Sequence, residues 1–239
     1  MSVVAVIPTR LASTRFPRKA LADRTGYPLV VHACMQAAKA RTVDRVLVAA
    51  DGEEIQAAVE AHGYECTLTD PNHPNGTSRI NEALRDVACD YVVNVQGDEP
   101  ELDPAHIDQA VECLRNHDEC VVATLATPFE SEQDPADPNL VKVMIDEHGR
   151  ADGFSRIPPA DGQAHRHIGL YVYRRPFLPV YVDLPPTESE LQERLEQLRI
   201  LGHGHRIAVG LVPSGHEGID TPGQYDDFVA RWMESNRKS

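Results

Sequence analysis

Four basic residues lie close together near the start of the chain. They are Arg10, Arg15, Arg18 and Lys19, and residues 1–22 contain no acidic residue. The whole chain of 239 residues is acidic, with 23 Lys and Arg against 37 Asp and Glu and a formal net charge of −14. A basic cluster in such a chain suits an anionic ligand, and a triphosphate brings about four negative charges to be neutralised. The alternative is a loop whose cations pair with acids elsewhere in the chain.

Two further segments place carboxylates where they could hold a cation. Asp98 and Glu99 directly follow the apolar run 91–95, and Asp220 lies in the segment GIDTP (218–222). Carboxylates at a strand end can hold Mg²⁺, which prefers oxygen ligands and shares them with substrate phosphates. A turn role for the Asp98–Glu99 pair and a helix-capping role for Asp220 remain the alternatives.

The elements that position these segments follow from the hydrophobic pattern. Strands are expected at 3–7, 45–50, 64–68 and 91–95, and helices at 28–40, 53–62, 77–88 and from Pro104 onward. This alternation predicts right-handed crossovers and a mainly parallel sheet with helices on both faces. Ligands bind at the carboxyl ends of such strands, where the basic loop and Asp98 lie.

The second half of the chain has a different pattern. Strands are expected at 121–127, 141–145, 151–155, 168–173 and 207–212, with one charged helix at 188–201 and a last helix after Thr221-Pro222. No linker or repeat divides the chain. The pattern predicts one α/β domain over 1–239, with a small antiparallel insertion in about 128–212.

Several classes of protein are excluded or disfavoured. The chain has neither G-x-x-x-x-G-K-[ST] nor G-x-G-x-x-G, which argues against P-loop hydrolases and dinucleotide dehydrogenases. Its acidity argues against nucleic-acid and membrane partners, and no apolar run approaches the ~20 residues of a membrane span. The start of the chain lacks the pattern of a signal peptide, and five cysteines without a C-x-x-C pair favour buried thiols. A cytoplasmic protein is expected.

The order of motifs along the chain resembles one family. PTRLASTRFPRKAL (8–21), NGTSR (75–79), VNVQGDEP (93–100), RHIGLYVY (166–173), LEQLRIL (195–201) and GIDTP (218–222) resemble the signatures of 3-deoxy-manno-octulosonate (Kdo) cytidylyltransferases, and NLVKV (139–143) and FSR (154–156) continue the resemblance. The resemblance spans nearly the whole chain. It implies a nucleotide-diphospho-sugar transferase fold, a homodimer, Mg²⁺ as cofactor, and the joining of CTP and Kdo into CMP-Kdo with release of pyrophosphate.

The resemblance also implies roles for individual residues. The expected catalytic residues are Lys19, Arg15, Asp98 and Asp220, with Asp98 and Asp220 as the Mg²⁺ ligands. The expected nucleotide-binding residues are Arg10, Ser13, Arg15, Lys19, Thr77 and Arg79. The expected residues of the sugar-acid pocket are Gln96, Arg156, His167, Tyr171, Glu196 and Gln197.

This assignment agrees with what the chemistry needs. The anomeric hydroxyl would attack the α-phosphorus in line, so the protein mainly positions the reactants and stabilises charge. Lys19 and the arginines would stabilise the departing pyrophosphate, the metal could lower the pKa of the attacking hydroxyl, and Arg156 would hold the sugar carboxylate. His167 is expected to bind rather than to act as a base.

The chain departs from the family pattern at four places. Thr9 replaces Ala, Ser78 replaces an acid, and Arg18 replaces a Gly, which strains the loop if that position has a positive φ. The segment 157–166 is much shorter than the family's and lies near the expected sugar site.

These departures leave three hypotheses open. The leading one is CMP-Kdo synthesis. The second is CMP activation of another acid sugar, such as 8-amino-Kdo or a nonulosonate. The third is a catalytically silent paralogue that binds nucleotide, against which the retention of Lys19, Asp98 and Asp220 argues.

Overall fold

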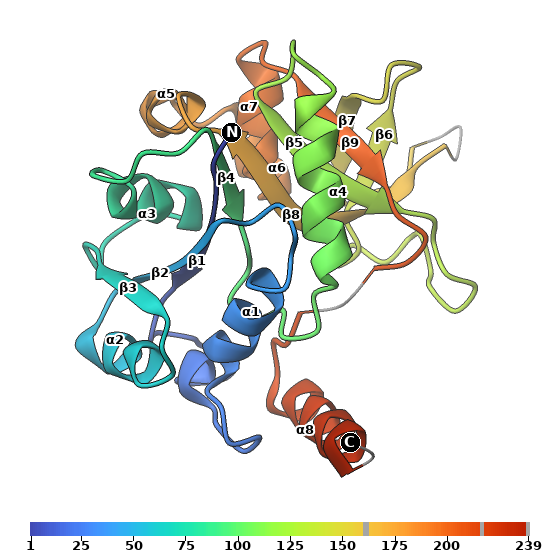
Figure 1. The fold of residues 1–239 in the computed structure, drawn as a ribbon. Helices are drawn as coiled ribbons and strands as arrows, with labels where there is room; N and C mark the ends of the chain where they lie inside the picture. The colour runs from blue at the N-terminus through green and yellow to red at the C-terminus, as the bar shows by residue number, and fades with distance from the viewer. Residues whose placement is uncertain (160–162, 216–217, 238–239) are drawn as a thin grey trace. The chain divides into compact units, whose positions relative to one another are not determined.

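The structure, a computed structural model, describes residues 1–159, 163–215 and 218–237 (Figure 1). The chain divides into two compact units, each of which is described by itself. The outer unit contains residues 2–89, 94–104 and the described residues from 218 onward, and the middle unit contains 90–93 and 105–215 together with Met1.

The outer unit is built on a parallel sheet. Its strands β1 (Val3–Thr9), β2 (Arg45–Ala50) and β3 (Glu65–Leu68) pair in the order β3-β2-β1, and both pairings are parallel. β1 is an almost continuous run of buried residues, because a parallel strand is covered on both faces. Helices α1 (Leu29–Ala37), α2 (Glu53–Glu60) and α3 (Gly76–Ala83) pack against these strands, and the 3₁₀ turn η1 (Lys19–Leu21) precedes α1.

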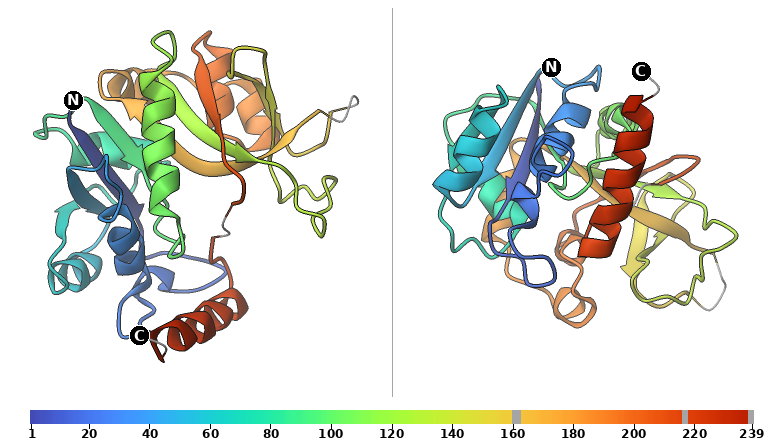
Figure 2. Two further views of the ribbon diagram at one scale, coloured as in Figure 1. Left: turned by 45° about the vertical axis from the view of Figure 1, so that its right-hand side comes forward. Right: turned by 90° about the horizontal axis from the view of Figure 1, so that it is seen from below.

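The last helix belongs to the same unit. α8 (Pro222–Arg237) begins after Thr221, whose Oγ1 accepts a hydrogen bond from the N–H of Gln224 at 3.3 Å. Its buried face joins Leu29 of α1, Ile219 and the partly buried Phe16 in one apolar cluster. In Figures 1 and 2, α8 accordingly lies beside the blue segment that follows β1. The cluster fixes the loop after β1 next to the segment that leads into α8.

The middle unit is mixed. β4 (Tyr91–Asn94, the first three residues in this unit), β8 (His165–Arg174), β5 (Val122–Thr127) and β9 (Ile207–Leu211) follow one another in this order. β5 is antiparallel to β8 and parallel to β9. The hairpin β6 (Lys142–Ile145) and β7 (Ala151–Ser155) adds to β8 through an antiparallel β6–β8 pairing. The helices are α4 (Pro104–Arg115), α5 (Phe177–Asp183), α6 (Glu188–Glu193) and α7 (Gln197–Gly202).

The expected elements agree with the observed ones except in two regions. The helix expected over 77–88 is α3, which ends at Ala83 because Leu84 leaves the helical conformation. The helix expected over 188–201 is two helices, because Arg194 adopts the left-handed conformation with φ 54° and ends α6. A short helix, α5, occupies a segment for which no element was expected. Its sequence FLPVYVD contains proline and β-branched residues, which hide a helix from pattern analysis.

The expected α/β class with a mainly parallel sheet is confirmed. The antiparallel β6–β7 and β6–β8 pairs lie within 128–212, whereas β5, which is also antiparallel to β8, precedes this range. That the chain forms one cytidylyltransferase domain over 1–239 stays a prediction. Within the described ranges, no helix is long and apolar enough to cross a membrane. All five cysteines are free, and burial raises the pKa of the Cys34 thiol to about 12, as expected for a structural thiol.

Candidate functional site

A single lysine joins three parts of the outer unit. The Nζ of Lys19 lies 2.6 Å from Oδ2 of Asp98 and 3.2 Å from Oδ1 of Asp220, and it donates to the carbonyl oxygen of Ile219 at 2.7 Å. The Lys19 side chain is 15% exposed, so the ammonium is largely withdrawn from water. Three residues expected to act together are therefore in contact, although up to 201 positions separate them in the sequence.

The backbone holds these carboxylates in place. The N–H of Ile219 donates to the carbonyl of Asp98 at 2.8 Å, which ties the loop after β4 to the segment before α8. Ile219 is 3% exposed and belongs to the apolar cluster, so Asp220 beside it is anchored by packing. A Cβ on Gly97 would lie 3.1 Å from Oγ1 of Thr9. The close approach of the loop to β1 therefore favours glycine there.

The basic loop extends the positive charge around this contact. Arg15 forms an ion pair with Asp220, with Nη2 and Oδ1 2.9 Å apart; the Arg15 side chain is largely exposed and that of Asp220 partly so. Arg18 adopts φ 58°, the left-handed conformation for which the family pattern has glycine, and its guanidinium pairs with Glu54. The condition under which arginine strains the loop, a positive φ at this position, is therefore met. The ion pair with Glu54 gives the Arg18 side chain a partner in that conformation.

A second group of cations lies at the ends of β1 and α3. Arg79 is 4% exposed, and its Nη1 donates to Oγ1 of Thr69 at 2.6 Å. Burial lowers the pKa of Arg79, the nearby Asp51 opposes this, and the positive charge of Arg10 adds to the lowering. Arg10 is exposed, and Asp51 accepts a hydrogen bond from the N–H of Leu11 at 2.9 Å. The positive charges of Arg10 and Arg79 thus act on each other, and the carboxylate of Asp51 offsets them only in part, which favours an anion nearby.

The remaining nucleotide residues lie in the same unit. Thr77 is 3% exposed in the first turn of α3, which Asn75 caps by accepting the N–H of Ser78 at 2.8 Å. Ser13 is half-buried in the basic loop.

Where the family pattern has an acid, Ser78 contacts His73, which pairs with Glu82. A carboxylate is thus still linked to this position through the histidine.

The donor set around Lys19 fits a hard divalent cation in part. The two carboxylates converge on one positive charge and both remain partly exposed, with side-chain exposures of 33% for Asp98 and 42% for Asp220. In the part of the chain that the structure describes, no group of three or more His, Cys, Asp or Glu gathers as a metal site. The protein could therefore supply two oxygen ligands, and a bound phosphate and water would complete the coordination, as is usual for Mg²⁺.

The expected sugar residues lie mainly in the middle unit. His167 contacts Oγ1 of Thr124 through Nε2 at 2.9 Å, and its ring lies 5.1 Å from that of Phe154 and 5.5 Å from that of Tyr171. Burial lowers the pKa of His167 to about 3, so this imidazole is neutral at physiological pH. A neutral, hydrogen-bonded ring suits binding better than proton transfer.

Glu196 and Gln197 lie at the start of α7, with Glu196 at the N-cap position and Gln197 as the first helical residue. Oε2 of Glu196 accepts a hydrogen bond from Tyr181 at 3.4 Å, and burial of the carboxyl raises its pKa while Arg199 opposes the rise. Gln197 is 6% exposed. Arg199 is held by two hydrogen bonds to the buried Glu190, at 2.6 and 2.8 Å, which fixes this corner of the unit.

Arg156, the expected partner of the sugar carboxylate, is largely engaged with the protein. Its Nε donates to the carbonyl of Glu193 at 2.8 Å and its Nη1 to the carbonyl of Pro138 at 2.9 Å. Gln96 lies in the outer unit, 3.4 Å from Asn94, and residues 160–162 of the short segment lie outside the described residues. The structure thus gathers Lys19, Asp98, Asp220 and Arg15 directly, and divides the other expected residues between the two units.

Sequence reasoning missed the residues that support this site. Asp51 follows β2, so its position at a carboxyl strand end was a signal that could have revealed it. Thr69 and His73 gave no such signal, because their roles depend on contacts with Arg79 and Ser78 that only the folded chain creates.

Comparison with known proteins agrees with this geometry. A cytidylyltransferase family model matches residues 4–207. The 3-deoxy-manno-octulosonate cytidylyltransferase of Polynucleobacter necessarius is 45% identical over 92% of this chain and 91% of its own, and that of Geobacter sulfurreducens is 42% identical over 97% and 99%. A solved structure of CMP:2-keto-3-deoxy-manno-octonic acid synthetase complexed with CTP has a TM-score of 0.93 and 33% identity, and the match covers 98% of this chain and 100% of that one.

The chain belongs to the cytidylyltransferase family, a class of nucleotidyltransferase enzymes. Within that class, its relatives at 40–45% identity are named 3-deoxy-manno-octulosonate cytidylyltransferases. A glucose-1-phosphate thymidylyltransferase from Bacillus anthracis, 16% identical with a TM-score of 0.68, shares the fold.

Proposed function

We propose that this protein joins CTP and 3-deoxy-D-manno-octulosonate into CMP-Kdo and releases pyrophosphate. The observation that carries the proposal is the contact of Lys19 with Asp98 and Asp220 beside the basic loop. Such an arrangement suits a metal–triphosphate complex, and the relatives that share the whole length of the chain carry the name of this activity. Both substrates are small anions, in keeping with a basic loop in an otherwise acidic chain.

The reaction needs one bond made and one broken. The anomeric oxygen of the sugar forms a bond to the α-phosphorus, the bond from that phosphorus to the pyrophosphate oxygen breaks, and the hydroxyl proton passes to solvent water. Lys19, with Arg15 and Arg10, stabilises negative charge as it moves onto the pyrophosphate. Thr77 and Arg79 of α3 contribute on the nucleotide side.

Asp98 and Asp220 would hold Mg²⁺, which fits their oxygen donors. When bound, the metal supplies positive charge at the α-phosphate and favours ionisation of the attacking hydroxyl. Because Lys19 contacts both carboxylates, its ammonium would have to move away from them, or contact them together with the metal, when the metal–triphosphate complex binds. Its other partner, the carbonyl of Ile219, offers it an anchor that does not compete with the metal.

The sugar acid is expected in contact with Gln96, Arg156, His167, Tyr171, Glu196 and Gln197. Each offers a hydrogen-bonding group, and Arg156 adds the charge that a carboxylate needs. The short segment 157–166 raises a second candidate from the same reaction class, in which the acceptor is 8-amino-Kdo or a nonulosonate.

The deciding experiment measures pyrophosphate release from CTP and Mg²⁺ with Kdo, 8-amino-Kdo and N-acetylneuraminate in parallel. Release with Kdo at the highest kcat/KM is the expected result. Faster turnover of another acid sugar would move the assignment to that acceptor and make the short segment the specificity element. No release with any of the three, together with retained CTP binding, would favour the catalytically silent paralogue.

We further infer a homodimer. The middle unit exposes several large apolar side chains, which a second copy could cover: Ile157, Val180, Val182, Leu191 and Leu211. Light scattering should then give a particle of twice the 26.4 kDa chain mass. A Leu191→Glu variant tests whether this surface is involved, since a buried carboxylate would weaken the association.

A further inference from the structure

One arginine of the middle unit has a buried nitrogen without a hydrogen-bond partner among the described residues. Arg166 of β8 is 5% exposed, its Nε is buried with no hydrogen-bond partner, and its side chain forms no ion pair with any described residue. Burying a guanidinium in this way is costly, because the charge loses water and gains nothing in return. A charged group that is buried without a protein partner is often kept for a ligand.

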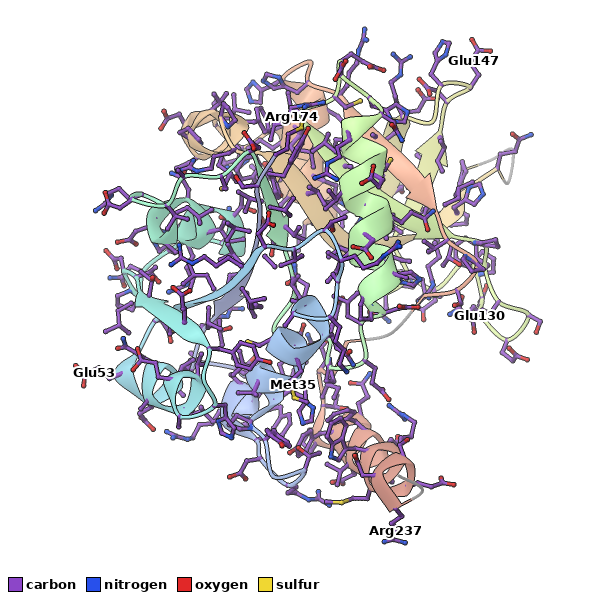
Figure 3. All side chains as sticks on the ribbon, in the orientation of Figure 1. Met35, Glu53, Glu130, Glu147, Arg174 and Arg237 are labelled. Carbon is purple, nitrogen blue, oxygen red and sulfur yellow. The ribbon has the colours of Figure 1, made fainter. Side chains whose placement is uncertain are left out.

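A second arginine on the same strand provides the contrast. Arg174, labelled in Figure 3, donates to the carbonyls of Cys120 at 2.9 Å and Leu114 at 3.0 Å, and to the hydroxyl of Tyr91 at 3.2 Å. The fold therefore satisfies one arginine of β8 with its own carbonyl and hydroxyl oxygens. At Arg166 the described residues provide no such oxygens.

Arg166 lies in a row of buried polar side chains that crosses three neighbouring strands. Thr127 of β5 and Lys142 of β6 are its register partners on either side, so the three side chains share one face of the sheet. Thr127 is fully buried, and its Oγ1 has no hydrogen-bond partner. The row thus contains two buried cations and a free hydroxyl at the carboxyl end of β5.

Lys142 adds positive charge to this row. It is fully buried, and its Nζ donates to the carbonyls of Asp137 at 2.6 Å and Arg156 at 2.9 Å. Asp134 and Asp137 act on Lys142, but neither forms an ion pair with Arg166. The charge at Arg166 therefore remains uncompensated.

The guanidinium of Arg166 packs directly against Gly215. A Cβ at this position would lie 2.1 Å from Nη2 of Arg166 and 3.3 Å from Cδ1 of Ile168. Any other residue would displace the guanidinium. The backbone here is thus adapted to the position of Arg166.

We propose that Arg166, with Thr127 and Lys142 beside it, forms a binding site for a small oxyanion. A guanidinium binds carboxylate and phosphate oxygens in a bidentate manner, and a hydroxyl can add a third hydrogen bond. The oxyanion is either the carboxylate of the sugar acid or a free phosphate. The first case rests on the proposed function and accords with the engagement of Arg156 by two carbonyls; the second does not depend on it.

The first measurement is thermal unfolding in inorganic phosphate against chloride at equal ionic strength, with wild type, Arg166→Gln and Arg166→Lys. Phosphate should raise the midpoint of the wild type, since an anion that binds only the folded chain stabilises it. Arg166→Gln should abolish the rise that depends on this site, and Arg166→Lys should keep part of it. Each of the three proteins is also measured with Arg15→Gln as an additional substitution, because this change weakens phosphate binding by the basic loop.

Two glycine variants keep the test sharp if Arg166→Gln folds poorly. Gly215→Ala should abolish the same phosphate effect by displacing the guanidinium. Gly223→Ala is the matched control, because a Cβ there meets open space, and it should respond to phosphate like the wild type.

The second measurement identifies the oxyanion. If it is the sugar carboxylate, Arg166→Gln should raise the KM for Kdo at least tenfold and leave the KM for CTP unchanged. If it is free phosphate, the KM for Kdo stays the same while the phosphate effect disappears. The proposal is overturned if wild type and Arg166→Gln have equal midpoints and equal KM values. It is also overturned if the substitution lowers the midpoint by the same amount with and without phosphate, because Arg166 would then be a structural residue. Inactivity of the wild type with Kdo would instead refute the proposed function, and the phosphate measurement would still decide on this site.

Discussion

At the scale of single residues, the site depends on a balance of charge around Lys19. One ammonium neutralises two carboxylates that would otherwise repel each other, and a carbonyl oxygen fixes its position. A divalent cation could take over that role, because it also attracts both carboxylates. The same three residues can therefore serve in the empty and in the loaded enzyme.

This balance predicts the effect of removing either carboxylate. Asp98→Asn and Asp220→Asn should each lower turnover by about 100-fold or more at limiting Mg²⁺, since metal stabilisation of the transition state is worth several kcal/mol. Pyrophosphate release at varied Mg²⁺ measures the effect. Glu99→Gln is the matched control in the same loop and should keep near wild-type turnover. Wild-type turnover by either Asn variant at limiting Mg²⁺ would rule out the metal role of that residue.

Arg18, like Arg194, has a left-handed backbone conformation that residues with a side chain disfavour. A left-handed φ of 58° suits glycine, and β-branched residues tolerate it least. Arg18→Gly should therefore unfold at a temperature no lower than the wild type, whereas Arg18→Val should lower the midpoint by about 2–4 °C. Thermal unfolding followed by circular dichroism checks both. A lower midpoint for the glycine variant would show that the ion pair with Glu54 outweighs the backbone preference.

At the scale of elements, the pair α6 and α7 shows how a local conformation divides a helix. The segment 188–201 has helical composition throughout, but a turn at Arg194, with φ 54°, ends α6, and Arg199 of α7 donates to the carboxylate of Glu190. This turn places Glu196 and Gln197 at the start of α7. An unbroken helix would place them on a different face.

The start of α6 is fixed by a capping box. Oγ1 of Thr187 accepts the N–H of Glu190 at 3.3 Å, and the Glu190 carboxylate accepts the N–H of Thr187 at 3.4 Å. Thr187→Ala should lower the free energy of unfolding by about 1 kcal/mol. Thr187→Ser retains the hydroxyl and should stay close to the wild type. Urea denaturation of the three proteins measures the difference, and equal loss in both variants would mean that the methyl group matters rather than the cap.

At the scale of the whole molecule, buried neutral histidines link stability to pH. His32 is 1% exposed, contacts Oγ1 of Thr25 at 2.6 Å, and packs against Phe228 and Trp232 of α8. Burial lowers the pKa of His32 to about 4. The unfolded chain, with a histidine pKa near 6.5, therefore binds more protons between pH 4 and 6.5 than the folded one. The stability that this histidine contributes is present above pH 6.5 and is lost as the pH falls towards 4.

The corresponding variant is His32→Gln, which keeps a hydrogen-bonding group but cannot titrate. Between pH 6.5 and 5, its free energy of unfolding should fall less steeply than that of the wild type, by about one proton of linkage. Denaturation at several pH values in this range gives both slopes. His167 remains in both proteins and contributes equally to each, so the difference reports on His32 alone. Parallel pH profiles would contradict the assignment.

The sequence by itself determined the positions of most strands, the order of the loops that follow them, and which of these loops contain charged residues. β1, β2 and β7 were predicted closely, because buried strands and short hairpins leave a pattern of neighbouring residues. The basic loop, Asp98 and Asp220 could also be singled out, since charge and position at strand ends are local properties. The break at Arg194 and the helix α5 were not predicted, because in both cases the local pattern opposes the observed conformation.

Only the tertiary structure decided which of these residues meet. The contacts of Lys19 with Asp98 and Asp220 depend on the apolar cluster that holds Phe16 beside Ile219, and packing between distant segments leaves no signature in a single sequence. The difference between Arg174 and Arg166 has the same origin. Two arginines on one strand look alike in the sequence, but one folds among carbonyl oxygens, whereas the buried Nε of the other meets no acceptor in the part of the chain that the structure describes.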